Sequence, residues 1–516
     1  MAKKLTERKK KRIERTAENN RSYKALVYNR AIVCILFALL QVGVSVALLC
    51  TTDFGLVWQT VAGVLALLVV LYLAGREQRH PTQTLWIILL LVAPIVGLPL
   101  YLLYGDGRPN VALKKRYEKA RHALREFPTP KQSPQVGHVG CFLKNEGYPT
   151  YLDGEISYYP TGRALYEGML EGVRSANKFI FLEYFIVSGG KMWNGLLKEL
   201  LKKAENGVEI KIIYDDFGSI FSLPPRYARY LEGLHKNIKC LPFNKVYPIF
   251  TARYNHRDHR KILVVDGKLA FTGGANLADE YIGEKIRFGY WKDTGVCVRG
   301  EAAAGFTKIF LETWLACKEP SLEISKYFGG EHIGTGTGKI IPCADSPLDR
   351  MQVSECLYLE MIHAAKRRLY ITTPYLALDD RLKTSLCMAA ARGVDVRIIT
   401  PGIPDKKLVY RLTRANYAPL LAAGVKIYEY SPGFMHAKMT LSDDTAAVGT
   451  ANYDYRSLYL HFENLVYFED KDGVAAVAQD MEETFAVCRE RTKENTKRSL
   501  FGRLIDLILK LFEPLL

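Results

Sequence analysis

The chain has 516 residues, enough for two or three domains, and its 71 Lys and Arg against 54 Asp and Glu give a formal net charge of +17. This excess indicates an anionic partner, either a nucleic acid or an anionic membrane surface. The ten cysteines are scattered and include no C-x-x-C pair. That spacing argues against a zinc site or a disulfide framework and is typical of a reducing compartment.

Residues 1–30 form a basic tail with eleven Lys and Arg against three Glu. A solvated tail and a cytoplasmic flank that contacts anionic lipid both explain this composition, and both place the tail inside the cell. Three uncharged apolar stretches follow, at 31–50, 54–74 and 85–104. Each is close to the roughly 20 residues needed to cross hydrocarbon. The sequence therefore predicts N-terminal transmembrane helices in a membrane region over 31–104.

A basic linker is predicted at 105–139, and it makes the topology ambiguous. Three full crossings from an inside N-terminus would place this linker outside, whereas its Lys and Arg residues favour the cytoplasm. Pro94, Gly97 and Pro99 interrupt the third apolar stretch, so a bent or re-entrant segment resolves the conflict. A stretch that lies at the membrane interface resolves it equally well. We expect a multi-pass protein of the cell membrane whose remaining domains are cytoplasmic.

From about residue 140 the chain repeats one α/β unit. Each copy contains an amphipathic helix, an apolar strand, a second helix that ends at glycine, and a second strand. The first copy occupies 162–176, 179–182, 193–206 and 208–214, and the second occupies 354–365, 368–372, 381–392 and 394–399. This alternation predicts a mixed or parallel sheet flanked by helices. We expect two lobes, 140–335 and 336–492, related by a pseudo-twofold axis.

Each half carries the pattern H-x-K-x4-D followed by G-x-A-N. The two copies comprise His259, Lys261, Asp266 and Asn276, and His436, Lys438, Asp443 and Asn452. Residues two apart on a strand point to the same face, so each copy projects an imidazole beside an ammonium group. Two facing copies would form a pocket suited to an anionic phosphoryl group. One imidazole can attack phosphorus, the other can protonate the leaving oxygen, and the cations can hold the remaining oxygens.

A carboxylate begins an apolar strand after each of these asparagines. The two residues are Asp293 and Glu463. Such a carboxylate can accept the second ring N–H of a catalytic imidazole and fix its tautomer. An ordinary acid at a strand end explains the pattern as well. We group these two acids with Asn276 and Asn452 as substrate-binding residues.

Residues 493–516 are predicted to form a C-terminal amphipathic helix. Its charged residues recur at three- and four-residue spacing with apolar residues between them: Arg503, Asp506, Lys510 and Glu513. The segment is too short and too charged to span a bilayer. It is expected either to lie in the membrane interface or to pack on the second lobe.

The paired motifs resemble the signature of the phospholipase D superfamily. With the N-terminal apolar stretches, Trp291–Thr294, Gly449–Ser457 and the apolar C-terminus, the chain resembles bacterial cardiolipin synthases over nearly its whole length. One departure is His461, where the resemblance leads us to expect Asn. The resemblance implies an α/β fold of two phospholipase D-like lobes. It also implies a phosphatidyltransferase whose catalytic residues are His259, Lys261, Asp266, His436, Lys438 and Asp443.

The reaction implied by the resemblance transfers a phosphatidyl group between two phosphatidylglycerol molecules. Its products are cardiolipin and glycerol, and its intermediate is a phosphohistidine. We expect anionic phospholipids and the membrane as partners and no nucleic acid. No cofactor or metal is expected, because the lysines supply the positive charge.

Several alternatives remain open from the sequence. A hydrolytic phospholipase D or a related phosphatidyltransferase would need the same residues, and a membrane-anchored nuclease is less favoured. A non-enzymatic scaffold is disfavoured, because both motifs are intact. The identity of the nucleophilic histidine and the oligomeric state are not determined.

Overall fold

The computed structural model describes residues 43, 55–76, 82–105, 111–127, 137–246, 255–328, 336, 338–496 and 499–513. The predicted basic tail (1–30) lies outside the described residues. So does the first apolar stretch (31–50), apart from residue 43, which is helical.

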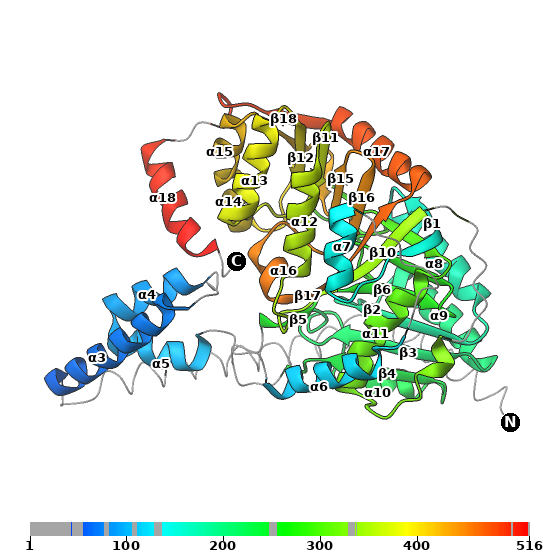
Figure 1. Cartoon of the computed structure of the whole chain (residues 1–516). Coiled ribbons are helices and arrows are strands. Elements are labelled where there is room, and N and C mark those ends of the chain that lie inside the picture. The colour runs from blue at the N-terminus through cyan, green and yellow to red at the C-terminus, as the bar shows by residue number, and fades with distance from the viewer. Residues whose placement is uncertain are drawn as a thin grey trace.

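One mixed sheet runs through both lobes (Figure 1). The first lobe contributes β1 (Tyr151–Tyr159), β2 (Phe179–Tyr184), β3 (Glu209–Asp215), β4 (Ile238–Phe243), β6 (Lys261–Val265), β7 (Leu269–Gly273) and β9 (Gly295–Arg299). The second contributes β10 (Gly338–Asp345), β11 (Arg368–Thr372), β12 (Asp395–Pro401), β13 (Lys426–Tyr430), β15 (Met439–Ser442), β16 (Thr445–Gly449), β17 (His461–Glu469) and β18 (Cys488–Arg491).

The strand order shows the internal repeat directly. It runs β18-β13-β12-β11-β15-β16-β17-β10-β1-β9-β7-β6-β2-β3-β4. Counted outward from the antiparallel β1–β10 pair, the strands of the two lobes occupy equivalent places, and β18 is an addition to the second lobe. The motif strands β6 and β15 occupy matching positions. The predicted pair of pseudo-symmetric α/β lobes is confirmed.

The repeated helices lie where the sequence placed them. They are α8 (Gly162–Ser175) and α9 (Lys191–Glu205) in the first lobe, and α12 (Val353–Ala364) and α13 (Asp380–Ala391) in the second. The turns after α9 and α13 contain Gly207 at φ +91° and Gly393 at φ +89°. Glycine adopts this left-handed conformation without a steric penalty, so both helices end there and the chain enters the next strand.

The two lobes share a hydrophobic core. One cluster of buried residues joins β6 and α11 (Ala303–Cys317) of the first lobe to β15, β17 and α17 (Lys471–Ala486) of the second. Within it, the rings of Phe181 and Phe310 stack with centroids 4.4 Å apart. Each lobe also has a cluster of its own. The shared core fixes the lobes relative to each other, which a site on their axis requires.

The structure differs from the predicted linker at 105–139. Helix α6 (Val111–Ala123) buries Leu113, Tyr117 and Ala120 in the shared core, and Arg121 forms an ion pair with Glu312 at 3.2 Å. Helix α7 (Gly137–Asn145) packs on α12 of the second lobe. Apolar residues at i, i+4 and i+7 give α6 one buried face, a pattern that its many basic residues obscured.

Helices α3 (Gly55–Ala74), α4 (Gln83–Val92) and α5 (Pro94–Tyr104) pack together and project from the body (Figure 1). The third apolar stretch is divided at Ala93, which leaves helical geometry at φ −140° and ψ 68° just before Pro94. A Cβ atom at Gly97 would lie 2.9 Å from the carbonyl oxygen of Leu89, so glycine allows α5 to fold back on α4. The expected bend is therefore present.

Among the residues that the structure describes, no helix is long and apolar enough to cross a membrane. The membrane location stays a prediction. The predicted C-terminal helix is present as α18 (Leu500–Leu511), beside α14 (Lys407–Ala415).

Candidate active site

Each motif histidine is held in place by the opposite lobe. Strand β5 (Arg257–Asp258) pairs with the start of β17, and the backbone N–H of His259 donates to the carbonyl of Phe462 at 2.8 Å. Strand β14 (Gly433–Met435) pairs with β8 (Tyr290–Lys292), and the N–H of His436 donates to the carbonyl of Lys292 at 2.8 Å. The two motifs are thereby brought to one cavity on the pseudo-twofold axis.

A buried carboxylate from the opposite lobe lies behind each imidazole. Both oxygens of Glu463 lie 2.9 Å from Nδ1 of His259, and Oδ2 of Asp293 lies 2.6 Å from Nδ1 of His436. A carboxylate accepts the Nδ1–H, which leaves the lone pair of Nε2 available. Asp293 and Glu463 do not line the cavity. The predicted contact with a ring N–H is confirmed, whereas the grouping of both acids as substrate-binding residues is corrected, because they orient the histidines from behind.

The motif lysines are buried beneath the histidines. Lys261 Nζ donates to the carbonyl of His259 at 2.5 Å, and Lys438 Nζ donates to the carbonyl of His436. Burial lowers the pKa of Lys261 to about 7 and that of Lys438 to about 8, while nearby carboxylates oppose the shift. Burial and these two cations also hold the pKa of both histidines well below the usual range. Both imidazoles are therefore neutral at pH 7, as a nucleophile must be.

The two motif asparagines line the cavity, as the sequence predicted. Asn276 Nδ2 donates to the hydroxyl of Tyr281 at 2.6 Å, and Asn452 Nδ2 donates to Asp454 at 2.9 Å. A primary amide carries two N–H groups, so each asparagine keeps one for a bound oxygen.

The motif aspartates lie outside the cavity. The carboxylate of Asp266 accepts three backbone N–H groups at the start of β2, from Asn177, Lys178 and Phe179. Asp443 does the same at the start of β11, with Lys366, Arg367 and Arg368. Both aspartates have positive φ, +54° and +51°, and stand in the turns that end β6 and β15. Their predicted catalytic role is corrected, because each anchors a hairpin at the end of the strand opposite to its histidine.

The cavity has a volume of about 420 Å³ and combines apolar walls with charged groups. His259 and His436 line it, together with eight aromatic side chains: Phe185, Phe217, Tyr281, Phe288, Trp291, Tyr375, Phe434 and Tyr455. Its charged lining residues are four cations and four acids: Arg257, Arg287, Lys406 and Arg456, and Glu280, Asp405, Asp454 and Glu513. Such walls suit a molecule that carries both an anionic group and apolar chains.

Sequence reasoning did not identify most of this lining. The family resemblance was the sequence signal that could have identified part of the lining, because its segments contain Trp291, Tyr455 and Arg456. Arg257 precedes His259 by two residues, a spacing that also places residues on one strand face. The remaining residues are scattered along the chain, and only tertiary contacts bring them together.

His461 also lines the cavity, with its ring centroid 5.4 Å from that of His259. Burial lowers the pKa of His461 to about 3. His259, His461 and Glu463 offer ligand atoms that all lie within 4.8 Å of one another, a grouping able to hold a metal ion. The absence of a required metal stays a prediction.

The comparisons with known proteins agree with this geometry. A family model described as "Cardiolipin synthase, PLD-like domain" matches residues 169–314 and 358–488, more than half of the chain. The chain belongs to the cardiolipin synthase family of phospholipase D-like proteins. It is therefore a phosphatidyltransferase of the phospholipase D superfamily.

Cardiolipin synthase 2 of Bacillus anthracis is 34% identical over 463 residues, which cover 85% of this chain and 88% of that protein. A Streptococcus mutans protein described as uncharacterized is 40% identical over 461 residues, with coverage of 87% and 99%. The crystal structure of phosphatidylserine synthase from Haemophilus influenzae superposes with a TM-score of 0.55 at 15% identity. That match covers 78% of this chain and all of the other, and it supports the fold alone.

Proposed function

We propose that this phosphatidyltransferase joins two phosphatidylglycerol molecules into cardiolipin and releases glycerol. The observation that carries the proposal is the pair of histidines, each backed by a carboxylate, that line one aromatic-walled cavity. The relatives named cardiolipin synthase support the choice of substrates.

In the first step, Nε2 of one motif histidine attacks the phosphorus of a phosphatidylglycerol. A P–N bond forms and the P–O bond to glycerol breaks. The second histidine donates a proton to the departing oxygen. An anionic phosphodiester beside the imidazoles favours their charged form, so its binding allows the second histidine to carry this proton. The asparagine amides hold the non-bridging oxygens, and the buried lysine ammonium groups add positive charge beneath them.

In the second step, the hydroxyl of another phosphatidylglycerol attacks the phosphohistidine. The second histidine, now neutral, takes the proton of that hydroxyl, the P–N bond breaks, and cardiolipin leaves. Water at the same position would give phosphatidic acid, which is the hydrolytic alternative. The aromatic walls favour transfer, because they exclude water from the intermediate.

The deciding experiment incubates the purified enzyme with phosphatidylglycerol vesicles and resolves the products. Cardiolipin and glycerol in equal amounts are expected, and the His436→Ala variant is the matched control. Phosphatidic acid as the main product would replace the proposal with the hydrolytic one.

We also propose that the apolar N-terminal segments anchor the protein in the cell membrane with both lobes in the cytoplasm. The basic residues of 1–30 and of α6 support a location of both segments on the cytoplasmic side of the membrane. Single cysteines at positions 9 and 115, in a chain without the native ten, would test this with an impermeant thiol reagent on intact cells. If position 115 is labelled and position 9 is not, the lobes lie outside the cell.

A further inference from the structure

Helix α18 turns an acidic residue toward the lobe and several large apolar side chains outward. Asp506 accepts from Arg411 Nε at 2.8 Å, and Glu513, just past the helix, accepts from Asn416 Nδ2 at 2.8 Å. Both acids are buried. Four large apolar side chains of the helix are more than half exposed: Phe501 (72%), Leu504 (54%), Leu507 (66%) and Ile508 (53%). A helix that packs for its own stability buries its apolar face, so α18 has the orientation of a helix that meets an apolar surface.

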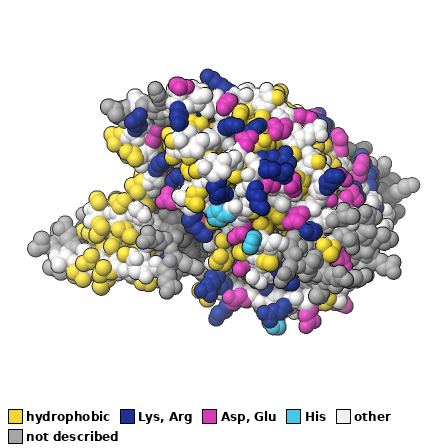
Figure 2. Space-filling model, turned by 45° about the horizontal axis from the view of Figure 1, so that its top comes forward, with side chains coloured by type: hydrophobic (Ala, Val, Ile, Leu, Met, Phe, Trp, Pro, Cys, Tyr) yellow, Lys and Arg dark blue, Asp and Glu magenta, His cyan; other side chains and the backbone are white. Residues whose placement is uncertain are grey.

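A second exposed apolar surface lies at the same end of the molecule (Figure 1). Figures 1 and 2 show α18 and the projecting helices α3–α5 at one end of the body. In α3 and α4 the exposed side chains include Leu68, Leu71, Leu91 and Val92. Because both surfaces lie at one end of the body (Figure 1), a single bilayer can contact them together.

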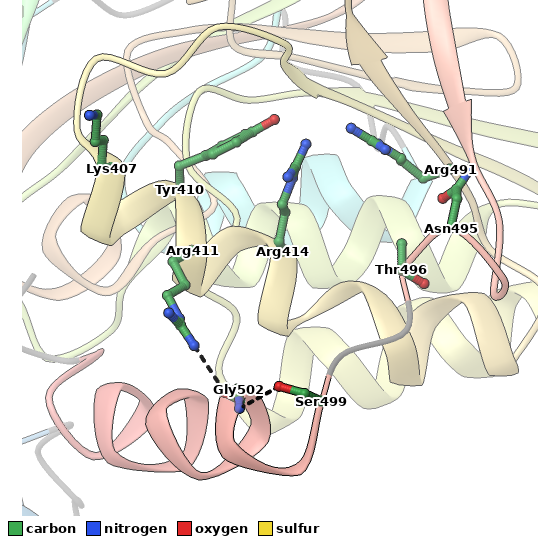
Figure 3. A pocket seen from close by; sticks show the side chains of 9 residues that line it. All are labelled: Lys407, Tyr410, Arg411, Arg414, Arg491, Asn495, Thr496, Ser499 and Gly502. Carbon is green, nitrogen blue, oxygen red and sulfur yellow. Dashed lines mark hydrogen bonds between the residues drawn. The ribbon is translucent and has the colours of Figure 1, made fainter.

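A basic pocket of about 450 Å³ lies where α14, the chain after β18 and the start of α18 meet (Figure 3). Its cationic lining residues are Lys407, Arg411, Arg414 and Arg491. Polar side chains complete the lining: Tyr410, Asn495, Thr496 and Ser499. The pocket is therefore rich in hydrogen-bond donors at the base of an exposed apolar helix.

The charges of this pocket are not balanced within it. Arg414 and Arg491 share the single carboxylate of Glu429, and Arg411 pairs with Asp506. Lys407 is exposed and has no ion-pair partner among the described residues. Four cations against two carboxylates leave a surplus of two positive charges. The surplus favours an anion, and the guanidinium and ammonium donors suit a phosphate group.

We propose that this pocket binds the phosphate of an anionic phospholipid in the bilayer on which the apolar face of α18 rests. Cationic side chains beside an exposed apolar helix face form the combination that binds anionic membrane surfaces. The pocket is distinct from the catalytic cavity, because opposite faces of α14 line the two. Val409 and Leu412 line the cavity, whereas Lys407 and Arg414 line the pocket.

Docking at this pocket also sets the position of the cavity. Glu513 lines the catalytic cavity and follows α18 directly. A docked α18 therefore holds the cavity next to the lipid surface. This consequence rests on the proposed function, but the binding test does not, because its readout is the position of α18 and not turnover.

The test places an environment-sensitive fluorophore on a cysteine at position 507 of the full chain, with the native cysteines replaced. The chain also carries His436→Ala, so that lipid is not consumed. It is reconstituted in phosphatidylcholine vesicles with or without phosphatidylglycerol, which contain a nitroxide quencher on the acyl chains. Emission and quenching report the ratio of docked to undocked helix. We expect phosphatidylglycerol to raise this ratio.

Lys407→Gln should lower the ratio in phosphatidylglycerol vesicles about fivefold, since one basic side chain near an anionic surface contributes about 1 kcal/mol. Lys198→Gln, on the exposed face of α9, is the matched control and should change nothing. A fluorophore that stays in water in both vesicles would overturn the proposal. If Lys407→Gln and the parent give the same ratio in phosphatidylglycerol vesicles, the pocket does not bind the lipid phosphate. Energy transfer between labelled copies, independent of lipid, would show instead that a second chain covers α18.

Discussion

The two halves of the active site share their topology but differ in how the carboxylate behind each histidine is held. Glu463 contacts His259 through both oxygens and accepts a hydrogen bond from Thr450 Oγ at 2.5 Å. Asp293 contacts His436 through Oδ2 alone, and its Oδ1 accepts the backbone N–H of Thr294 at 2.9 Å. One carboxylate is therefore held by a rotatable hydroxyl and the other by a fixed backbone group.

This difference explains why one motif reads G-G-A-N and the other G-T-A-N. A Cβ atom at Gly274 would lie 2.2 Å from Oδ1 of Asp293 and 2.9 Å from the carbonyl of His436. The equivalent position, Thr450, has room for a side chain that supports the longer Glu463. The halves share one pattern but are not interchangeable, which is what separate roles as nucleophile and acid would require.

The largest expected effect is the loss of either histidine. His259→Ala and His436→Ala should each lower turnover by about 10⁶-fold, because nucleophile and acid act as a unit. The double variant should be no slower than either single one. Cardiolipin formation is the measurement. Near-normal synthesis by one single variant would show that the halves are not both needed.

The next effect separates the two carboxylates. In Asp293→Asn, the amide oxygen continues to accept the N–H of Thr294, so the amide nitrogen faces Nδ1 of His436. The amide then donates to Nδ1, which selects the wrong tautomer of the ring. We expect turnover to fall by about 10⁴, as for other histidine-orienting carboxylates. In Glu463→Gln, the amide nitrogen can turn to Thr450 Oγ and leave the oxygen for His259, so the loss should be smaller. A greater loss in Glu463→Gln would contradict this account of the asymmetry.

The pH dependence should be bell-shaped around neutrality. Burial raises the pKa of Asp293 to about 7, so His436 loses its acceptor as the pH falls through that value. Lys261 and Lys438, with pKa values of about 7 and 8, lose their charge as the pH rises. The profile of kcat/KM reports these free-enzyme groups. An acid limb that persists in Asp293→Asn would assign that limb to another residue.

The smallest expected effect concerns metal. Turnover should be unchanged after exhaustive EDTA treatment, because two lysines already supply positive charge. The grouping of His259, His461 and Glu463 makes this test informative, with His461→Asn as the comparison. A loss that one divalent ion restores in the parent but not in His461→Asn would place a required metal at this half of the site.

The sequence predicted the residues that recur at a fixed spacing. It did not predict roles that depend on the position of a side chain along its strand or on contacts with the other lobe. The histidines, lysines and asparagines recur at fixed spacing, so their pattern was enough. The motif pattern does not state that Asp266 lies beyond the far end of a five-residue strand, away from His259. Asp293 was recognised as a possible acceptor for a histidine ring N–H, but the histidine that it contacts was not identified, because that contact crosses between lobes.

The covalent step is the central claim, and trapping the intermediate tests it most directly. The enzyme is mixed with phosphatidylglycerol labelled at phosphorus, quenched rapidly, and digested, and the labelled peptide is sequenced. The account predicts an acid-labile label on one histidine only, His259 or His436, which unlabelled phosphatidylglycerol chases into cardiolipin. Cardiolipin formed at a normal rate, with no protein-bound label at any quench time, would contradict it.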